Sequence, residues 1–295
     1  MGMSVNTNVG AMAALQALNS TSKGLATTQN RINSGMNVSS TKDDSAAFTI
    51  AQNLRGDLGG LKAVTSSLSR AKSVTDVAVA GAEQISDVVN QMKTLAKQAS
   101  DSGISSETRK AYNEDFKALT KQIGTIVDSS SFNGTNLLKT SGGTVSALQS
   151  LTNTNATPAT AYTPDSLTVA NQGTDGGFTL ATTAAAGVLS TAAGDDIDDA
   201  DGTKAKAMVT TLDSLSKKIG TSLSTLGSAS RNIDNQLTFS SKLSDTIESG
   251  IGNLVDADLA KESARLQALQ VKQQLGVQAL SIANQAPQTI TSLFR

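Results

Sequence analysis

The chain has 295 residues and a formal net charge of −1, so it carries no general positive field for nucleic acid or anionic lipid. It contains no cysteine and no histidine, which excludes disulfides, cysteine–histidine zinc sites and histidine-based acid–base catalysis. Aromatic residues make up only 3% of the chain, so stacking platforms for single-stranded nucleic acid are missing and the core must consist of Leu, Ile, Val and Ala.

The chain begins with an uncharged tail, and Lys23 is its first charged side chain. Apolar residues recur in the tail in alternating steps of four and three, which is the spacing of helices that supercoil about one another. This pattern predicts a first helix with one apolar seam. The seam residues are Ala11, Leu15, Leu18, Leu25 and Ile32, with the polar residues Ser22 and Gln29 between them. The tail lacks the charged start and apolar middle of a secretory signal peptide. Because no run of eighteen apolar residues occurs, we expect no membrane insertion.

Three further segments continue the four–three spacing, and they predict long helices in a coiled-coil-like bundle. They run from Val64 to Ala99, from Tyr112 to Ile126 and from Met208 to Ile247. Turn signals separate them. The stretch SDSGISSE predicts a helix that is capped by Ser106 and carries Glu107 in its first turn, and FNGTN predicts a tight turn.

The composition changes between Lys139 and Lys204, where the chain has no Lys or Arg and holds seven Asp. Within this insert, DSLTVANQGTDGGFTLATT favours two short strands about a Gly-rich turn. The stretch DDIDDADG resembles part of a calcium-binding loop. An EF-hand loop needs Asp at position one and Glu at position twelve, but counting back from Gly202 puts Ile197 at position one and Met208 at position twelve. A solvated acidic loop is therefore the favoured interpretation, and no metal or other cofactor is expected.

No motif predicts an enzyme. Ser-x-x-Lys occurs four times in this Ser-rich chain without its companion motifs, and a phosphate-binding Gly-rich loop with Lys is absent.

The stretch DADLAKE predicts the start of the last helix, with Asp256 or Asp258 as its N-cap. The predicted seam of this helix carries Leu259, Leu266, Leu269 and Leu280, and a second apolar stripe carries Val271, Leu275 and Ile282. Two apolar faces need two partners. One partner is the N-terminal helix. For the other face, copies of the same chain are a better partner than a membrane, because membrane-binding helices carry Lys, Arg and aromatic residues beside the apolar stripe. Pro287 marks where the helix bends or ends, before Leu293 and Phe294 anchor the terminus.

Three stretches resemble bacterial flagellins. They are the opening SVNTNVGAMAALQALNSTSKGLATTQNRINSGMNVSSTKDDSAAFTIAQNLR, the short FNGTNLL, and the closing NLVDADLAKESARLQALQVKQQLGVQALSIANQAPQTITSLFR, which is especially similar to flagellins of alphaproteobacteria. The resemblance implies a mostly α fold, in which paired N- and C-terminal segments form a long coiled-coil-like bundle with a small irregular or β outer insert. It implies that residues 1–42 and 252–295 form inner terminal helices, residues 43–140 and 203–251 a helical rod, and residues 141–202 the solvent-facing insert.

The resemblance also implies a function: a structural subunit that self-assembles into the flagellar filament used for motility, after export through the flagellar type III apparatus. The implied partners are other copies of the chain, the cap and hook-associated proteins and an export chaperone, in an extracellular filament. Two alternatives stay open, namely a hook–filament junction protein with the same kind of ends, and a cell-surface adhesin that binds polysaccharide through the insert.

One stretch departs from the family pattern. Many flagellins are recognised by an innate immune receptor through a rod patch that reads QRxRELxVQ. Here the stretch reads NQMKTLAKQ, in which Gln91 replaces the Arg, Thr94 replaces the Glu and Leu95 is kept. The comparison implies weak activation of such a receptor.

Overall fold

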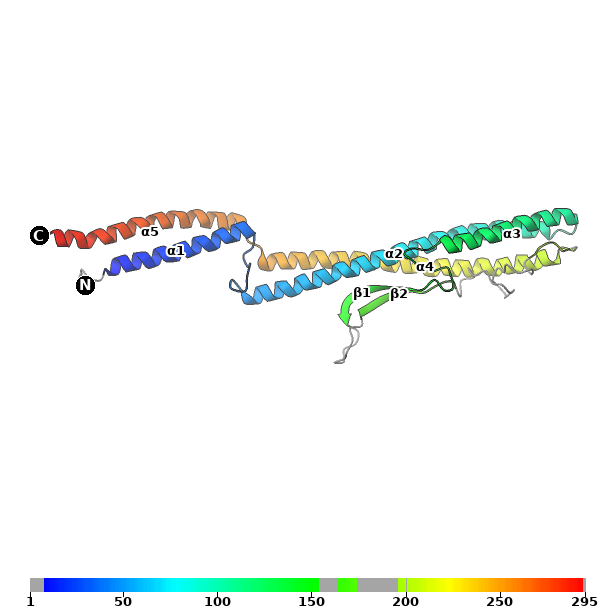
Figure 1. Cartoon of the computed structure of the whole chain (residues 1–295), viewed down its shortest axis with the longest axis horizontal. Coiled ribbons are helices and arrows are strands. Elements are labelled where there is room, and N and C mark those ends of the chain that lie inside the picture. The colour runs from blue at the N-terminus through cyan, green and yellow to red at the C-terminus, as the bar shows by residue number, and fades with distance from the viewer. Residues whose placement is uncertain (1–7, 154–163, 174–195, 200, 294–295) are drawn as a thin grey trace. The chain divides into compact units, whose positions relative to one another are not determined.

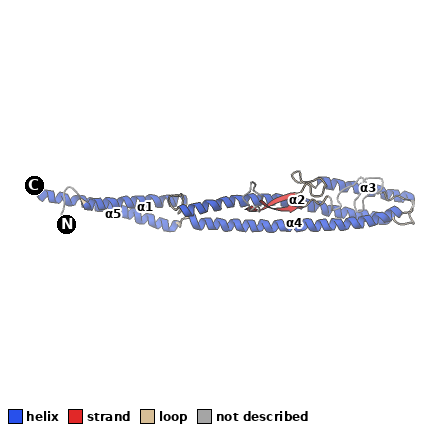
Figure 2. Ribbon diagram, turned by 90° about the horizontal axis from the view of Figure 1, so that it is seen from below, coloured by secondary structure: helices blue, strands red, loops and turns tan. Residues whose placement is uncertain are grey.

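The fold, in a computed structural model that describes residues 8–153, 164–173, 196–199 and 201–293, is dominated by five helices (Figures 1 and 2). In chain order the elements are α1 (Val9–Ser34), α2 (Ser45–Ala99), α3 (Ser106–Ser129), β1 (Val145–Asn153), β2 (Pro164–Val169), α4 (Thr203–Val255) and α5 (Leu259–Leu293). This confirms the predicted mostly helical fold with a small β element. The chain divides into two compact units, Met1–Leu58 with Asp245–Arg295 and Gly59–Ser244, so α2 and α4 contribute to both.

The larger unit is built around the seam of α2. Every four–three position predicted from Val64 to Ala99 is at most 1% exposed. These positions are Val64, Leu68, Ala71, Thr75, Ala78, Ala82, Ile85, Val89, Met92, Ala96 and Ala99. The one polar member, Thr75, donates its hydroxyl to the carbonyl oxygen of Ala71 at 2.9 Å, so its burial leaves no donor unsatisfied. Buried side chains of α3 and α4, such as Phe116 and Leu212, complete this core and confirm the predicted coiled-coil-like packing.

The turns around α3 follow the sequence signals with one correction. The N-cap is Ser105, whose side chain accepts from the Thr108 N–H, and the predicted cap Ser106 is wrong because its backbone is already helical. Glu107 lies in the first turn as predicted. In FNGTN, Phe132 and Thr135 exchange two backbone hydrogen bonds around Asn133 (φ 49°) and Gly134 (φ 80°), which confirms a tight turn with two left-handed residues.

The small sheet pairs β1 with β2 in antiparallel register, from Val145 opposite Val169 to Asn153 opposite Pro164. The predicted strand DSLTV is therefore present, but it pairs with an upstream strand that the sequence did not indicate. The second predicted strand, in GFTLATT, lies outside the described residues. Val145, Ala147 and Val169 are buried in the core of the larger unit.

Side chains of the two long helices hold β1 in place. Ser67 of α2 accepts from the Leu148 N–H at 3.2 Å, and Gln236 of α4 donates to the Gln149 carbonyl oxygen at 2.7 Å.

The chain that follows β2 is anchored by Asn171. Its side-chain amide donates to the carbonyl oxygens of Asn136, Lys139 and Gly143 at 3.2, 2.9 and 2.7 Å. Its side-chain oxygen accepts from the Gly173 N–H at 2.7 Å. This residue ties the insert to the loop after α3.

A second anchor holds residues 196–199 against α3, which differs from the solvated acidic loop expected from the sequence. Ile197 is fully buried, and its N–H donates to the Asn113 side chain at 3.0 Å. The Asp196 carboxylate accepts from Lys117 at 3.0 Å and from Asn113 at 3.3 Å. Within the described ranges, no cluster of three acidic side chains is placed to hold a metal ion.

Arg109 of α3 is the largest of the fully buried side chains in this region. Its guanidinium donates to the carbonyl oxygens of Ala99 at 3.0 Å, Asp101 at 2.8 Å and Asp199 at 2.8 Å. It therefore satisfies the end of α2, the following turn and the anchored segment together.

The Asp196 anchor makes stability depend on pH. The hydrogen bond from Lys117, assisted by Asn113, holds the pKa of Asp196 below its ordinary value of 3.8. Because the folded-state pKa is the lower one, this stabilisation is complete above the unfolded-state pKa and is lost as the pH falls through the folded-state value. We expect the free energy of unfolding of the wild type to fall more steeply below about pH 4 than that of Asp196→Asn, which urea unfolding between about pH 5 and pH 2 measures. Parallel curves for the two proteins would contradict this assignment.

The smaller unit includes the link between α1 and α2. Gly35, with φ 70°, ends α1, and the Asn37 and Val38 N–H groups donate to the Val255 carbonyl oxygen at 2.7 and 3.2 Å. Val38 and Val255 are buried with Ala51 and Ile251 in a small separate core.

Helix α5 begins at one of the two caps predicted for it. The Asp258 side chain accepts from the Ala260 and Lys261 N–H groups at 3.0 and 3.1 Å, and so it is the N-cap. The helix then continues through Pro287 to Leu293. Of the two outcomes expected at Pro287, a bend or an end, the end is therefore wrong, because the proline removes one helical N–H without ending the helix.

Candidate self-assembly interface

Helices α1 and α5 lie antiparallel and contact each other along their length, with the start of α1 and the end of α5 on the same side of the unit (Figure 1). Partly or fully buried positions follow each helix in steps of three and four, which is coiled-coil spacing. On α1 they include Ala11, Ala14, Leu18, Thr21, Leu25, Thr28 and Ile32. On α5 they include Glu262, Leu266, Leu269, Gln273, Gly276, Leu280 and Ala283. We call these residues the terminal seam.

The structure places most, but not all, of the sequence-predicted residues on the terminal seam. Those on it are Ala11, Leu18, Leu25, Ile32, Leu266, Leu269 and Leu280. Leu15 is 49% exposed, and Leu259 is also half exposed, so both lie off the seam. Of the two residues predicted to anchor the terminus, Leu293 is the last residue of α5, and Phe294 lies outside the described residues.

Sequence reasoning missed the alternate positions of α1, namely Ala14, Thr21 and Thr28. Ala14 is small, and Thr21 and Thr28 carry hydroxyl groups, so these positions give a weak apolar signal. The four–three pattern instead selects Leu15, Ser22 and Gln29, which lie on the neighbouring face of the helix. Thr28 is in fact the most buried residue of α1, at 1% exposure. The useful signal is a small residue three or four positions from a seam leucine.

Two glycines of the terminal seam lie against leucines of the opposite helix, at distances that would still admit a Cβ. A Cβ built on Gly24 would lie 3.6 Å from a methyl group of Leu269, and one on Gly276 would lie 3.4 Å from a methyl group of Leu18. Each of these leucines therefore packs on a glycine of the opposite helix.

Polar contacts hold the terminal seam near both ends. At the first, the Asn8 side chain accepts from the Ala11 N–H at 3.0 Å and donates to the Ala283 carbonyl oxygen at 2.7 Å. At the second, Arg31 pairs with Glu262, with 3.3 Å between Nη1 and Oε1. The Glu262 side chain is only 9% exposed.

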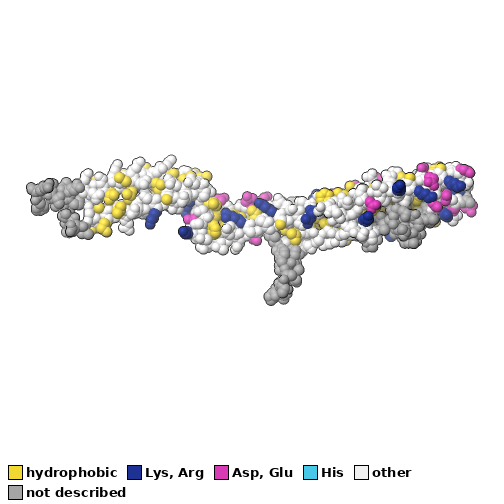
Figure 3. Space-filling view, in the orientation of Figure 1, with side chains coloured by type: hydrophobic (Ala, Val, Ile, Leu, Met, Phe, Trp, Pro, Cys, Tyr) yellow, Lys and Arg dark blue, Asp and Glu magenta, His cyan; other side chains and the backbone are white. Residues whose placement is uncertain are grey.

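Both helices also carry apolar side chains that the unit itself does not cover. Val9 and Met12 of α1, and Val271, Leu275 and Ile282 of α5, are each more than half exposed. A helix turns about 100° per residue, which puts these side chains on the sides of α1 and α5 that face away from the terminal seam. We call the two groups the outward surfaces. Figure 3 shows hydrophobic side chains reaching the surface over both helices.

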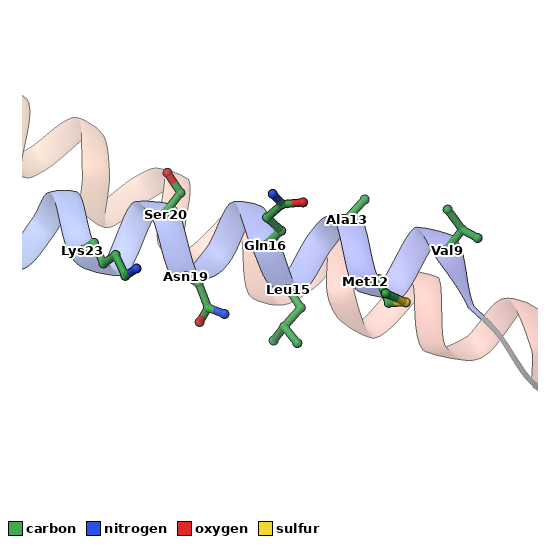
Figure 4. Close-up of a pocket in the computed structure, with 8 residues that line it drawn as sticks. All are labelled: Val9, Met12, Ala13, Leu15, Gln16, Asn19, Ser20 and Lys23. Atoms are coloured by element: carbon green, nitrogen blue, oxygen red, sulfur yellow. The ribbon is translucent and has the colours of Figure 1, made fainter.

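The outward surface of α1 includes a shallow apolar pocket (Figure 4). Its lining residues are Val9, Met12, Ala13, Leu15, Gln16, Asn19, Ser20 and Lys23, all from α1 itself. A depression on the side of one helix does not enclose a small molecule, and Lys23 is the one charge at its rim. Its shape and chemistry fit the side chains of another protein surface.

Among the described residues, no helix combines the length and hydropathy of a membrane span. Uncovered apolar surfaces on more than one side of a subunit are what a helical polymer of identical copies requires, since its contacts are heterologous and do not close. The fold and its outward surfaces thus define the class of self-assembling filament subunits.

Comparisons with known proteins identify the family. The N-terminal helical region of bacterial flagellin matches residues 5–142, and the C-terminal helical region of bacterial flagellin matches residues 209–294. The chain belongs to the bacterial flagellin family, as its sequence resemblance implied.

Individual relatives match along nearly the whole chain. Flagellin FljM of Caulobacter vibrioides is 42% identical over 99% of this chain and 98% of its own length. A flagellin of Brucella melitensis is 38% identical, and flagellin C of Rhizobium meliloti 32% identical, each over 99% of both chains. These sources are alphaproteobacteria, as predicted. The crystal structure of Bacillus cereus flagellin is a more distant match, at 20% identity and a TM-score of 0.45 over 59% of this chain and 88% of that chain.

Proposed function

We propose that this flagellin polymerises by burying the outward surfaces of α1 and α5 against other copies of itself. As a member of its family the chain is a structural subunit of the flagellar filament, and the function that it serves is motility. The observation that carries the proposal is that both helices of one antiparallel pair expose apolar side chains away from their shared seam. Each helix can therefore contact a different neighbour, which a growing helical polymer requires.

The same proposal assigns each part of the chain to a part of the filament. Residues 1–42 and 252–295 form the inner helices of the filament, residues 43–140 and 203–251 the rod around them, and residues 141–202 the solvent-facing insert. The charge distribution supports this order. From Gln273 to Phe294, as from Met1 to Ser22, no side chain is charged, so these stretches can enter a packed interior without desolvating a charge.

The remaining partners belong to the same proposal. The chain is exported through the flagellar type III apparatus with a chaperone, grows under a cap above hook-associated proteins, and works outside the cell without catalysing a reaction. A sequence without cysteine suits this route, because no disulfide has to form before or after passage of an unfolded chain.

Seeded growth tests the proposal against the two alternatives. Purified chain is mixed with filament fragments and followed by electron microscopy. Long tubes are expected, whereas a junction protein would add only a few subunits. Replacing residues 174–195 with a Gly/Ser linker of the same length keeps the buried insert residues Val145, Val169 and Ile197. This variant should still grow tubes, whereas an adhesin that works through the replaced segment would lose its binding.

The terminal helices are expected to become ordered when the filament forms. A pair of isolated helices with a seam of small residues is marginal in water, since most helical stability comes from packing. Hydrogen exchange of the monomer should therefore show little protection in α1 and α5 and strong protection in the α2 seam, and polymerisation should protect all three. Strong protection of α1 and α5 in the monomer would count against this.

The immune-receptor patch is expected to stay weak in this chain. Gln91 and Thr94 are exposed on α2, and the Thr94 hydroxyl donates to the Asn90 carbonyl oxygen of its own helix at 3.1 Å. The neighbouring Lys93 is paired with Asp213 of α4. No charged group is therefore available at either replaced position for a charge-assisted hydrogen bond.

Restoring the two charges provides the test. The variant Gln91→Arg/Thr94→Glu should activate a receptor reporter cell roughly tenfold more strongly than the wild type, since one recovered charge-assisted bond is worth about 1.4 kcal/mol or more. The exposed substitution Glu83→Gln, about two turns before this patch on α2, serves as the control. A wild-type response as large as that of the restored variant would refute the prediction.

A further inference from the structure

The terminal seam holds one axial register along its length. The contacts across it pair Gly10 with Ala283, Gly24 with Leu269 and Arg31 with Glu262, and in each pair the two residue numbers add up to 293. Leu18 and Gly276, which also touch, add up to 294. The helices thus keep a constant alignment over their whole contact.

Apolar packing alone does not select this alignment. Sliding α5 by one heptad would again bring alanines, glycines, threonines and leucines together, because these residues recur along both helices. The hydrogen bond from Asn8 to the Ala283 carbonyl oxygen is equally permissive, since every turn of α5 offers a similar backbone oxygen.

The pair of Arg31 and Glu262 does distinguish the registers. One heptad of sliding would place Glu262 opposite Gly24 in one direction and, beyond the end of α1, opposite Val38 in the other. Neither position carries a cation, so a nearly buried carboxylate would lose its cross-helix partner. Lys23, Lys261 and Lys272 are exposed and do not face the terminal seam.

Arg265 does not change this conclusion. Its Nη1 lies 3.8 Å from Glu262 Oε1, but it belongs to the same helix and moves with Glu262 in every register. It therefore lowers the cost of burying Glu262 without indicating where α1 should lie.

The geometry of the pair is that of a specificity device rather than of an optimal stabilising contact. Only one oxygen of Glu262 faces Arg31, and Arg31 Nε and Glu262 Oε2 are buried without a hydrogen-bond partner among the described residues. A buried pair of this kind is often no more stable than an apolar pair of similar size, and its best-attested role is to fix registry.

We propose that Arg31 and Glu262 are positioning residues that set the axial register of α1 against α5 and so align the two outward surfaces. A slip of one heptad would shift one outward surface against the other by about 10 Å, at 1.5 Å per residue. Neighbouring copies could then engage only one of the two surfaces correctly. The assembly consequence rests on the proposed function, whereas the register itself does not.

Engineered cysteines can report the register, because the natural chain contains none. A Cβ built on Gly10 lies 3.9 Å from Ala283 Cβ, which is within the range of a disulfide. Gly10→Cys/Ala283→Cys therefore reports the observed register, and Gly10→Cys/Gly276→Cys reports a slip of one heptad. Both reporters are oxidised with diamide in the full-length chain, as monomer and in seeded filaments, and the cross-linked fractions are compared.

Three backgrounds are then compared: wild type, the charge swap Arg31→Glu/Glu262→Arg/Arg265→Glu, which also reverses the neighbouring charge on α5, and the apolar pair Arg31→Met/Glu262→Leu. Wild type and charge swap should form the 10–283 cross-link almost exclusively. The apolar pair should keep its helical content but raise the share of the 10–276 cross-link at least tenfold and elongate filaments more slowly. An apolar pair with the wild-type cross-link ratio would overturn the proposal, as would a charge swap that slips like the apolar pair. If wild-type chains failed to extend seeds at all, the proposed function would fail instead, and the cross-link ratio would still decide the register.

Discussion

Leu275→Asp is expected to abolish filament growth while leaving the folded single chain almost unchanged. Leu275 lies on the outward surface of α5 and is more than half exposed, so a carboxylate there stays hydrated in the monomer. In the filament the same carboxylate would be buried without a cation. An unpaired buried charge costs about 3–5 kcal/mol, which corresponds to a rise in the critical concentration of roughly a hundredfold to a few thousandfold.

The neutral substitution Leu275→Asn separates charge from lost apolar area. It has nearly the shape of Asp, and it should raise the critical concentration much less. Leu275→Met should grow like the wild type. Sedimentation of seeded reactions gives the critical concentrations, and circular dichroism of the monomers checks that the helices persist. Growth of Leu275→Asp at the wild-type concentration would show that this surface is not an interface.

Leu280→Asp should also block growth, but for a different reason. Leu280 is partly buried on the terminal seam, so the charge would separate α1 from α5 before any neighbour is met. The larger unit should stay folded in both variants, because its core contains neither residue. Hydrogen exchange at chain concentrations above the raised critical concentration of Leu275→Asp distinguishes them. There Leu275→Asp should form filaments in which α1 is protected, whereas Leu280→Asp should leave α1 unprotected at every concentration.

Arg109→Ala is expected to cause the largest loss of stability in the larger unit. The substitution removes a buried cation and strands the carbonyl oxygens of Ala99, Asp101 and Asp199. Three charge-assisted hydrogen bonds and the desolvation of their acceptors make a loss of about 3–5 kcal/mol in the free energy of unfolding reasonable. This is a large share of the roughly 5–15 kcal/mol that stabilise a typical domain.

The matched control for Arg109 is the next residue of the same helix. Lys110 is exposed, so Lys110→Ala should change the free energy of unfolding by less than about 0.5 kcal/mol. Arg109→Lys should recover only part of the loss, because one ammonium cannot reach three carbonyl oxygens in the fixed fork of a guanidinium. Urea unfolding measures all three variants. A midpoint of Arg109→Ala that matches the control would mean that the three bonds contribute little.

The seam of α2 could be predicted residue by residue, whereas that of α1 could not. Positions from Val64 to Ala99 are occupied by apolar residues with a single exception, so burial and hydropathy coincide. On α1 the alternate positions of the terminal seam are Ala14, Thr21 and Thr28, whereas the larger Leu15 is half exposed. Burial and hydropathy therefore do not coincide on α1, and the hydropathy pattern selects the neighbouring face at these positions.

The anchor at residues 196–199 could not be predicted for another reason. Arg109 and Asn113 stand in a helix with many charged neighbours, and nothing local shows which side chains are buried. Their partners in residues 196–199 lie more than eighty positions away along the chain. The strand β1 was missed because its inward positions, Val145 and Ala147, are too few to mark an alternating pattern.

The anchors at Asn171 and at residues 196–199 have a consequence for sequence change. They hold the chain on both sides of residues 174–195, so we expect a substitution in that segment to leave the contacts of α3 with residues 196–199 unchanged. Lengthening a loop between fixed ends costs only about 0.6 kcal/mol for each doubling. We therefore expect residues 174–195 of this flagellin to tolerate changes in sequence and length at little cost to the packing of the helices.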